Sequence, residues 1–234
     1  MQYLGEIKHE GEGSSRDRQS SPHAHWVGIS ADEKYLFSVD LGCDAVFTYD
    51  LQEVVSKISE VDNNIKPIHT VSFPGGTGPR HLIMSPDNKH AYVAGELSAE
   101  IFALSYEDGR FEIIEKHDVS ASSEGDELSS DELAQAAIRI TDDGRFVLIS
   151  VRGTDHLWSF KRDADSGQLT VADHKHVVGI WPRDFNILSD KKTVIVANER
   201  SNSLNALILN PDNGQLEATE HSITMAAPSC ILPL

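Results

Sequence analysis

The chain has 234 residues, of which 39% are hydrophobic, and its 37 acidic and 20 basic side chains give a formal net charge of −17. This length and apolar content are enough to bury a sizeable core in one domain spanning residues 1–234. The acidic balance argues against a nucleic-acid partner and against an anionic membrane surface, because both are bound through basic patches.

The N-terminal residues show no basic segment followed by an apolar one, and no apolar run approaches the roughly 18 residues of a membrane helix. We therefore expect a cytoplasmic protein. No P-loop, GxGxxG or GxSxG motif occurs, so neither nucleotide use nor serine-hydrolase chemistry is indicated.

Along the chain, residues 2–9 are predicted to form a lone strand, and a fourfold repeat follows. A short turn motif recurs at intervals of about 50 residues, at Ser30–Asp32, Ser85–Asp87, Thr141–Asp143 and Leu188–Asp190. Each motif is preceded by one apolar strand and followed by three more. The predicted units cover residues 22–74, 79–117, 136–178 and 182–224, and a second lone strand is predicted at 228–232.

Four short strands in every unit are typical of the blades of a β-propeller. Valine, isoleucine, tyrosine and phenylalanine dominate the strands, and glycine, proline, aspartate and asparagine cluster between them. Only residues 51–59 and 131–136 could hold a helical turn. The predicted fold is all-β, with four four-stranded antiparallel blades plus the flanking strands, as part of a seven-bladed propeller.

Two positions in the repeat carry polar residues that differ from unit to unit. The start of the first strand carries His25, Arg80, Ala136 and Arg183, and the end of the second strand carries Leu41, Glu96, Arg152 and Glu199. In a propeller these strand ends converge on one funnel. Unlike residues at equivalent places indicate a binding site, and salt bridges that cap turns are the structural alternative.

Several short sequence motifs, in this order along the chain, resemble those of the lactonase family of propellers. This family includes bacterial-type 6-phosphogluconolactonases and the fungal carboxymuconate cycloisomerase. The motifs are Gly78-Pro79-Arg80-His81, Tyr92 to Leu97, Ala137 to Phe146, Val151-Arg152-Gly153 and Trp181 to Phe185. The resemblance runs along the whole chain and implies seven blades, of which about the first two are absent here. It also implies that His25, Arg80, Glu96 and Arg152 are the active-site residues and that no cofactor is needed.

Opening a lactone with water requires a base, a cation for the developing oxyanion and a clamp for the anionic tail of the substrate. We expect Glu96 or His25 to act as the base and Arg80 and Arg152 to stabilise the oxyanion. Arg183 is expected to bind the distal anion. The remaining candidates for substrate binding are His81, Asn198 and Glu199, although strand alternation places His81 on the face opposite to Arg80.

The family often has asparagine before the glutamate and before the arginine, whereas this chain has Gly95 and Val151 there and keeps only Asn198. The pairs His23/His25 and His174/His176 have a spacing that metal ligands use, but no further ligand lies at a suitable interval, so no metal site is predicted.

Three functions stay open at this point: hydrolysis of a phosphorylated or acidic sugar lactone, a muconate-type cycloisomerase, and a protein-binding propeller without activity. The first two imply a small anionic lactone as the partner. The sequence does not determine the oligomeric state.

Overall fold

The computed structural model describes residues 3–60, 64–120 and 133–232. Within them, consecutive strands pair in antiparallel fashion to form four four-stranded sheets. The first sheet contains β1 (Ala24–Ile29), β2 (Tyr35–Asp40), β3 (Ala45–Asp50) and β4 (His69–Ser72). The second contains β5 (Pro79–Met84), β6 (His90–Gly95), β7 (Glu100–Glu107) and β8 (Arg110–Asp118).

The third and fourth sheets repeat this pattern. The third contains β9 (Ala134–Ile140), β10 (Phe146–Arg152), β11 (His156–Arg162) and β12 (Leu169–His176). The fourth contains β13 (Pro182–Ile187), β14 (Thr193–Asn198), β15 (Ser203–Leu209) and β16 (Leu216–Thr224).

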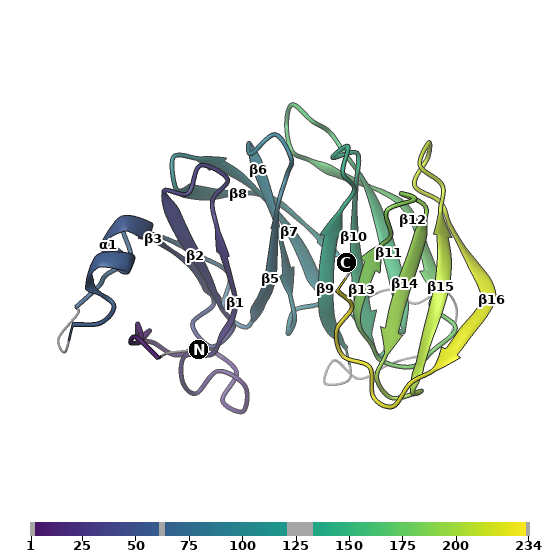
Figure 1. The fold of residues 1–234 in the computed structure, drawn as a ribbon, viewed down its shortest axis with the longest axis horizontal. Helices are drawn as coiled ribbons and strands as arrows, with labels where there is room; N and C mark the ends of the chain where they lie inside the picture. The colour runs from purple at the N-terminus through teal and green to yellow at the C-terminus, as the bar shows by residue number, and fades with distance from the viewer. Residues whose placement is uncertain (1–2, 61–63, 121–132, 233–234) are drawn as a thin grey trace.

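The four sheets stand side by side in an open arc, as the blades of a propeller do (Figure 1). The first strands of the sheets, β1, β5, β9 and β13, are neighbours along the arc, because β5 contacts β1 and β9, and β9 contacts β13. We call them the inner strands. The prediction of an all-β, partial propeller is confirmed, and the arc does not close into a ring.

The repeated turn motif has the same role in each unit. The hydroxyl groups of Ser30, Ser85 and Thr141 each donate to the aspartate two residues later, with oxygen–oxygen distances of 2.5–2.7 Å. In the fourth unit Leu188 has no hydroxyl group, and Asp190 instead accepts from Thr193 Oγ1 at 2.6 Å. A side chain that bonds its own loop in this way favours a turn over a continued strand.

The hydrophobic core consists of three clusters, each between two neighbouring sheets. Each cluster draws on both sheets: Phe37 and Phe102 in the first, Ile101 and Trp158 in the second, Leu148 and Phe185 in the third. Burying one such side chain stabilises the folded state by about 1.5–3 kcal/mol. A sheet is therefore stabilised mainly by the sheets beside it.

The side of the first sheet that faces away from the second has no sheet packed on it among the described residues. Val27 is 62% exposed there, whereas Leu82, Ile138 and Phe185 at the same repeat position are 0–2% exposed. Those three residues pack in the cluster shared with the preceding sheet. Val27 is exposed because no such neighbour covers it.

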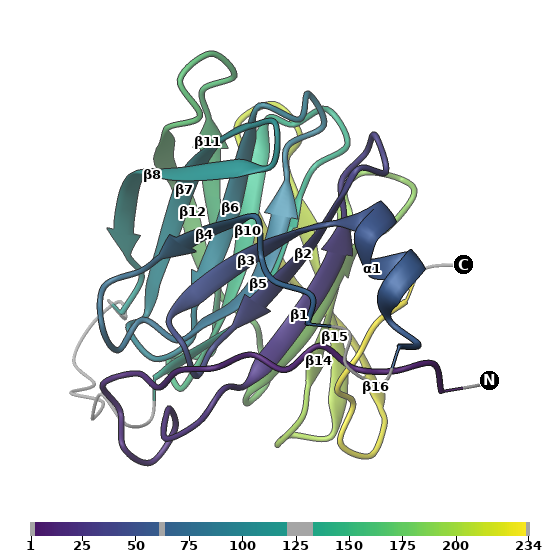
Figure 2. The ribbon, with the colours of Figure 1, turned by 90° about the vertical axis from the view of Figure 1, so that its left-hand side faces the viewer.

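The predicted lone strands do not form: residues 3–9 and 228–232 have no strand structure. Residue 2 lies outside the described part. The N-terminal segment runs along the lower edge of the first sheet (Figure 2), where His9 Nδ1 lies 2.6 Å from Asp40 Oδ2. Near the other end of the chain, the Ile231 N–H donates to Asp184 Oδ2 at 2.8 Å. Neither segment joins one of the four sheets in the described part of the chain, and the contacts of both to the sheets include these side-chain bonds.

One helix forms among the described residues, α1 (Leu51–Lys57), within the predicted range 51–59. The Asp50 side chain caps it by accepting from the Glu53 N–H at 2.8 Å. The second predicted helical stretch, 131–136, is wrong where it is described, because β9 begins at Ala134. Residues 131 and 132 lie outside the described part.

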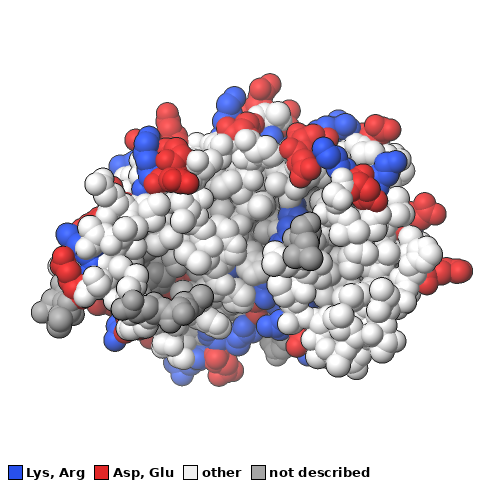
Figure 3. Space-filling view, in the orientation of Figure 1, with Lys and Arg blue, Asp and Glu red and all other residues white. Residues whose placement is uncertain are grey.

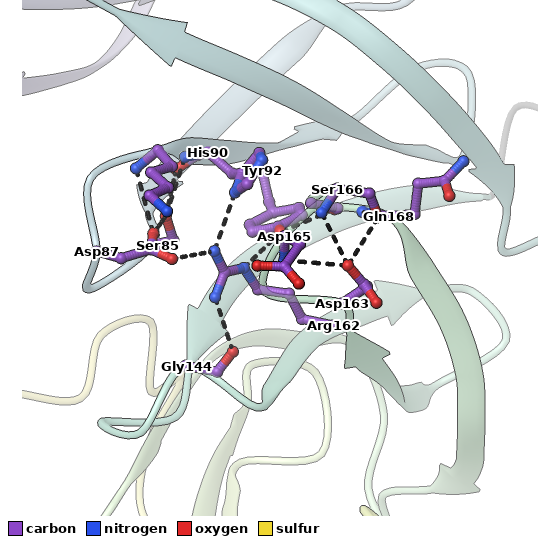
Figure 4. A network of polar contacts seen from close by, with 12 residues as sticks. Ser85, Asp87, His90, Tyr92, Gly144, Arg162, Asp163, Asp165, Ser166 and Gln168 are labelled. Atoms are coloured by element: carbon purple, nitrogen blue, oxygen red, sulfur yellow. Dashed lines mark hydrogen bonds and ion pairs between the residues drawn. The ribbon is translucent and has the colours of Figure 1, made fainter.

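A buried arginine joins the second and third sheets at the end where the turn motifs lie (Figure 4). Arg162 Nε donates to Tyr92 Oη at 2.9 Å, and its Nη2 donates to Asp87 Oδ2 at 2.7 Å and lies 2.9 Å from His90 Nδ1. Burial acts to raise the pKa of Asp87, but bonds from Ser85 and Arg162 outweigh it and lower that pKa to about 2.

Replacing Arg162 with methionine gives a side chain of similar length that cannot donate to Asp87 Oδ2 or to Tyr92 Oη. We expect Arg162→Met to reduce the free energy of unfolding by about 1–3 kcal/mol, because the hydrogen bonds of a buried arginine are lost and Tyr92 Oη keeps no charged partner. Urea unfolding measures the loss. The control is Lys161→Met, which changes the exposed residue next to it. Equal transition midpoints for the two variants would contradict the structural role of Arg162.

Candidate functional site

The inner strands are irregular at the same place in all four sheets. The pairing of each inner strand with the next strand shifts there, so that the inner strand has one residue more than its partner. The extra residue lies at or beside the predicted site position, which carries His25, Arg80, Ala136 and Arg183. Such β-bulges leave a residue outside the ladder and redirect its side chain. The repeat therefore places all four positions on bulges.

The bulge in β5 determines where His81 lies. Strand alternation predicts His81 on the face opposite to Arg80, and this is wrong. Its Nε2 lies 3.0 Å from Arg80 Nη1, and its ring centroid lies 5.2 Å from that of His25. A bulge interrupts the alternation of side chains, so neighbouring residues can point to one side. His25, Arg80 and His81 thus form one cluster.

Glu96 lies at the centre of the site and contacts three guanidinium groups. Its Oε1 accepts from Arg18 Nη2 at 2.7 Å, and its Oε2 lies 2.8 Å from Arg80 Nε and 3.2 Å from Arg152 Nη2. The side chains of Glu96, Arg80 and Arg152 are only 5–6% exposed. Three residues predicted from the sequence are therefore brought together by direct contact.

The site has more positive than negative charge. Three guanidinium groups surround one carboxylate, whereas the chain as a whole has a net charge of −17. In the face shown in Figure 3, charged side chains gather at the upper and lower edges, and basic atoms show in the recess near the centre. Burial acts to raise the pKa of Glu96, but Arg152, Arg18 and Arg80 outweigh it, so this pKa is lowered.

The third sheet holds the two buried arginines through its backbone. Arg80 Nη1 donates to the Ala136 carbonyl oxygen at 2.7 Å, and Arg152 donates to those of Ala134 and Gln135 at 3.1 and 2.8 Å. Burial lowers the pKa of Arg80 to about 10, so its guanidinium stays charged at neutral pH. Ala136, the small fourth member of the set, thus contributes a carbonyl group to the site.

His25 is a neutral imidazole at neutral pH. Burial, together with the charge of Arg80, lowers its pKa to about 4, and burial and Arg80 lower that of His81 to about 2. The Nδ1 atom of His25 is buried and has no hydrogen-bond partner among the described residues. A neutral imidazole with a free nitrogen can accept a proton from water, provided that water reaches it.

A cleft of about 660 Å³ opens beside this cluster. Its walls include Glu96, Arg152 and three further residues, Arg18, Trp181 and Arg200. The sequence analysis did not assign these last three to the site. Arg18 is outside the repeat, on a loop that is tied to the first sheet where Gln19 Nε2 donates to Leu41 O at 2.8 Å and to Asp44 Oδ1 at 2.7 Å. In the sequence, Trp181 appeared only in the motif from Trp181 to Phe185 that resembles the lactonase family, with no role assigned to it.

The other predicted ligands make no hydrogen bond or ion pair with Glu96 among the described residues, although the charge of Arg183 acts on Arg80 and Arg152. Arg183 Nη1 donates to Glu199 Oε2 at 3.2 Å, so these two form a separate, partly exposed pair. Asn198 is fully buried, and its Nδ2 donates to Asn205 Oδ1 within the fourth sheet at 2.9 Å. The asparagine that this chain keeps therefore faces the inside of a blade.

No group of three or more histidine, cysteine, aspartate or glutamate side chains is arranged to hold a metal ion in the described residues. The rings of His23 and His25 are 5.8 Å apart, and His174 stacks on Trp158 at 4.5 Å. In the same part of the chain, no helix is long and apolar enough to cross a membrane.

Comparison with protein families gives one match, to a family described as lactonase, seven-bladed β-propeller, over residues 3–233. Among curated proteins, the 6-phosphogluconolactonase of Bacillus subtilis is 32% identical over 228 residues. That alignment covers 97% of this chain and 62% of the relative, so the chain spans about three fifths of its length.

Solved structures give a similar result. The periplasmic gluconolactonase of Pseudomonas aeruginosa superposes with a TM-score of 0.84 and 31% sequence identity. The aligned region covers 97% of this chain and 61% of the gluconolactonase. A putative 6-phosphogluconolactonase from Bacteroides fragilis has a TM-score of 0.81 and 28% identity, and the alignment covers 96% of this chain and 61% of that protein. The likeness extends over nearly all of this chain.

Stability is expected to fall as the pH is lowered from 6.5 towards 4. The unfolded chain binds a proton at His25 near its ordinary pKa of 6.5, whereas the folded protein does so only near 4. The unfolded state then holds more protons, which favours unfolding. Urea unfolding at several pH values in this range gives the free energy of unfolding as a function of pH. The slope of that plot measures how many more protons the unfolded state binds, and in His25→Gln this number should be smaller by up to about one.

The control for this experiment is His221→Gln, which changes an exposed histidine and should leave the slope as in the unaltered protein. Parallel pH profiles for His25→Gln and the unaltered chain would show that His25 is not held neutral by the fold.

Proposed function

Because the chain belongs to the lactonase family of seven-bladed β-propellers, we propose that it opens a phosphorylated or acidic sugar lactone with water. Its relatives in Bacillus subtilis and Pseudomonas aeruginosa are a 6-phosphogluconolactonase and a gluconolactonase, which supports hydrolysis over the cycloisomerase and over a binding role without activity. Since the chain spans 62% of the Bacillus subtilis relative, the activity is a proposal for this protein.

The observation that carries the proposal is the contact of Glu96 with three guanidinium groups beside a cleft. Opening a lactone places negative charge on the carbonyl oxygen in the transition state. Fixed cations in a site with little water stabilise that charge without having to reorganise. Glu96 holds the guanidinium groups in place before the substrate arrives.

We assign oxyanion stabilisation to Arg152 and Arg80. Arg152 lines the cleft, and Arg80 contacts the same carboxylate oxygen of Glu96 as Arg152 does. Both keep a positive charge at neutral pH, and a guanidinium can offer two parallel N–H groups to an oxygen acid.

His25 is the better candidate for the base. Glu96 is an ionised carboxylate that already contacts three cations, so its lone pairs are weakly basic. His25 is neutral and has an unpartnered nitrogen. Its low pKa makes it a weak base in the free protein, and an anionic lactone nearby raises that pKa by Coulomb attraction. His81, which lies beside His25 and Arg80, is assigned to substrate binding.

Other assignments stay predictions. Arg183 and Glu199 form a pair close to the site, and Asn198 supports the blade behind them. A cytoplasmic location is proposed from the sequence, although one solved relative is periplasmic. We propose hydrolysis without a cofactor.

Removing a cation from the site should slow hydrolysis. We expect Arg152→Met to reduce kcat/KM for 6-phosphogluconolactone by about 10²–10³-fold, as for other lost oxyanion donors. Acid release at constant pH measures the rate. The control is Arg145→Met, which changes a half-exposed arginine in a turn between β9 and β10. Absence of turnover in the unaltered chain, or full activity in Arg152→Met, would refute the assignment.

The pH profile tests His25 as the base. If His25 accepts the proton, kcat/KM for gluconolactone, which has no phosphate group to titrate in this range, should be constant down to about pH 4 and decline below it, because this limb reports the pKa of the free protein. A base with an ordinary histidine pKa would give a limb near 6.5 instead. His25→Gln should lower kcat/KM at every pH and remove the limb; if the limb persists in this variant, another group is the base.

A further inference from the structure

Trp181 has a backbone conformation that is uncommon for a large residue. Its φ is 68°, in the left-handed region where a Cβ atom is crowded. Gly78 occupies the same position in the repeat, and its φ is 58°. The Gly78 N–H donates to Asp44 Oδ1 at 2.7 Å, and the Trp181 N–H donates to Asp155 Oδ1 at 2.8 Å. The two turns are thus built in the same way.

The fold needs this backbone but not an indole at this place. Glycine adopts a positive φ at no steric cost, whereas a bulky residue does so only where its surroundings enforce it. The second sheet has the glycine, and the fourth has the tryptophan at a cost in folding free energy. Backbone strain of this kind is concentrated at ligand-binding sites, where the side chain is needed for its contacts.

The contacts of the indole are two guanidinium groups. The central carbon of Arg200 lies 3.3 Å from the centroid of the Trp181 ring, and that of Arg152 lies 5.3 Å from it. Arg200 is exposed, and its guanidinium has no hydrogen bond or ion pair within the described residues. The stacking holds an otherwise mobile side chain at the wall of the cleft while leaving its N–H groups free.

We propose that Trp181 is a positioning residue that holds Arg200 at the cleft so that Arg200 and Arg18 bind the phosphate monoester of the lactone, remote from the bond that breaks. Both arginines line the same cleft as Arg152, and Arg18 is 46% exposed there. Guanidinium groups bind phosphate oxygens through paired N–H donors. This inference rests on the proposed lactone hydrolysis and adds the substrate class that the site selects.

The sequence assigns the distal anion to Arg183, and the structure gives reasons to prefer Arg200. Arg183 forms an ion pair with Glu199 at 3.2 Å and is not among the described residues that line the cleft, whereas Arg18 and Arg200 both line it. The guanidinium of Arg200 lines the cleft and forms no ion pair in the described part of the chain, although the charge of Asp155 acts on it. An anion at Arg200 therefore gains a cation without displacing another group.

Binding of reaction products tests the site without requiring turnover. Calorimetry with the full chain compares gluconate 6-phosphate with gluconate. We expect the phosphate to improve binding at least about tenfold, and Arg200→Gln and Trp181→Gly to abolish most of that difference. Trp181→Phe should retain part of it, because a phenyl ring also stacks on a guanidinium. Arg183→Gln should keep the difference, and Arg145→Gln is the control at an exposed arginine.

Trp181→Gly also separates a functional from a structural role. Because glycine relieves the strain, we expect its urea midpoint to equal or exceed that of the unaltered chain. Trp158→Gly, at a tryptophan that is 5% exposed in the core, should lose stability strongly. A large loss of stability in Trp181→Gly would show that the indole is retained for packing, and would overturn the inference.

The outcomes distinguish this inference from the proposed hydrolysis. If the chain hydrolyses lactones with and without phosphate at equal kcat/KM, the hydrolysis stands and the phosphate site is refuted. If gluconate 6-phosphate binds in an Arg200-dependent way but no lactone is opened, the site stands and the hydrolysis is refuted. If gluconate 6-phosphate binds no better than gluconate, or if Arg183→Gln alone removes its advantage, the inference fails.

Discussion

Packing of each sheet against its neighbours is the constraint on which the rest of this structure depends. All three hydrophobic clusters lie between sheets, so the ends of the inner strands are not needed for the core. Val27 shows the converse, because its face has no neighbouring sheet and it stays exposed. With the apolar faces providing the stability, the strand ends can carry charged residues that differ from one blade to the next.

The second organising interaction is electrostatic. Glu96 contacts Arg18, Arg80 and Arg152, which come from a loop and from two different sheets. Buried cations without a counter-charge are costly, and one carboxylate shared by three of them leaves a surplus that attracts an anion. A chain with a net charge of −17 thus keeps a small region in which positive charge is in excess.

The repeat supplies the same backbone several times, and function enters through the side chains placed on it. A bulge recurs in all four inner strands, yet it carries a histidine, two arginines and an alanine. The left-handed turn position is glycine in the second blade and Trp181 in the fourth. Where a side chain departs from what the backbone prefers, its contacts explain the departure better than the fold does.

The sequence by itself determined the strands, the blades and most of the charged set. Strand alternation and the repeated turn motif are local properties, so His25, Arg80, Glu96 and Arg152 could be aligned without coordinates. Only the tertiary structure decided the remaining contacts. A bulge turns His81 towards Arg80, and the Arg18 side chain bonds to Glu96. The guanidinium of Arg200 stacks on the Trp181 ring. The prediction of two flanking strands, at 2–9 and 228–232, was wrong for a related reason. A strand needs a partner strand, and the sequence of one segment does not show whether a partner is present. Contacts between residues far apart in the chain depend on how the sheets pack, and no local pattern encodes that.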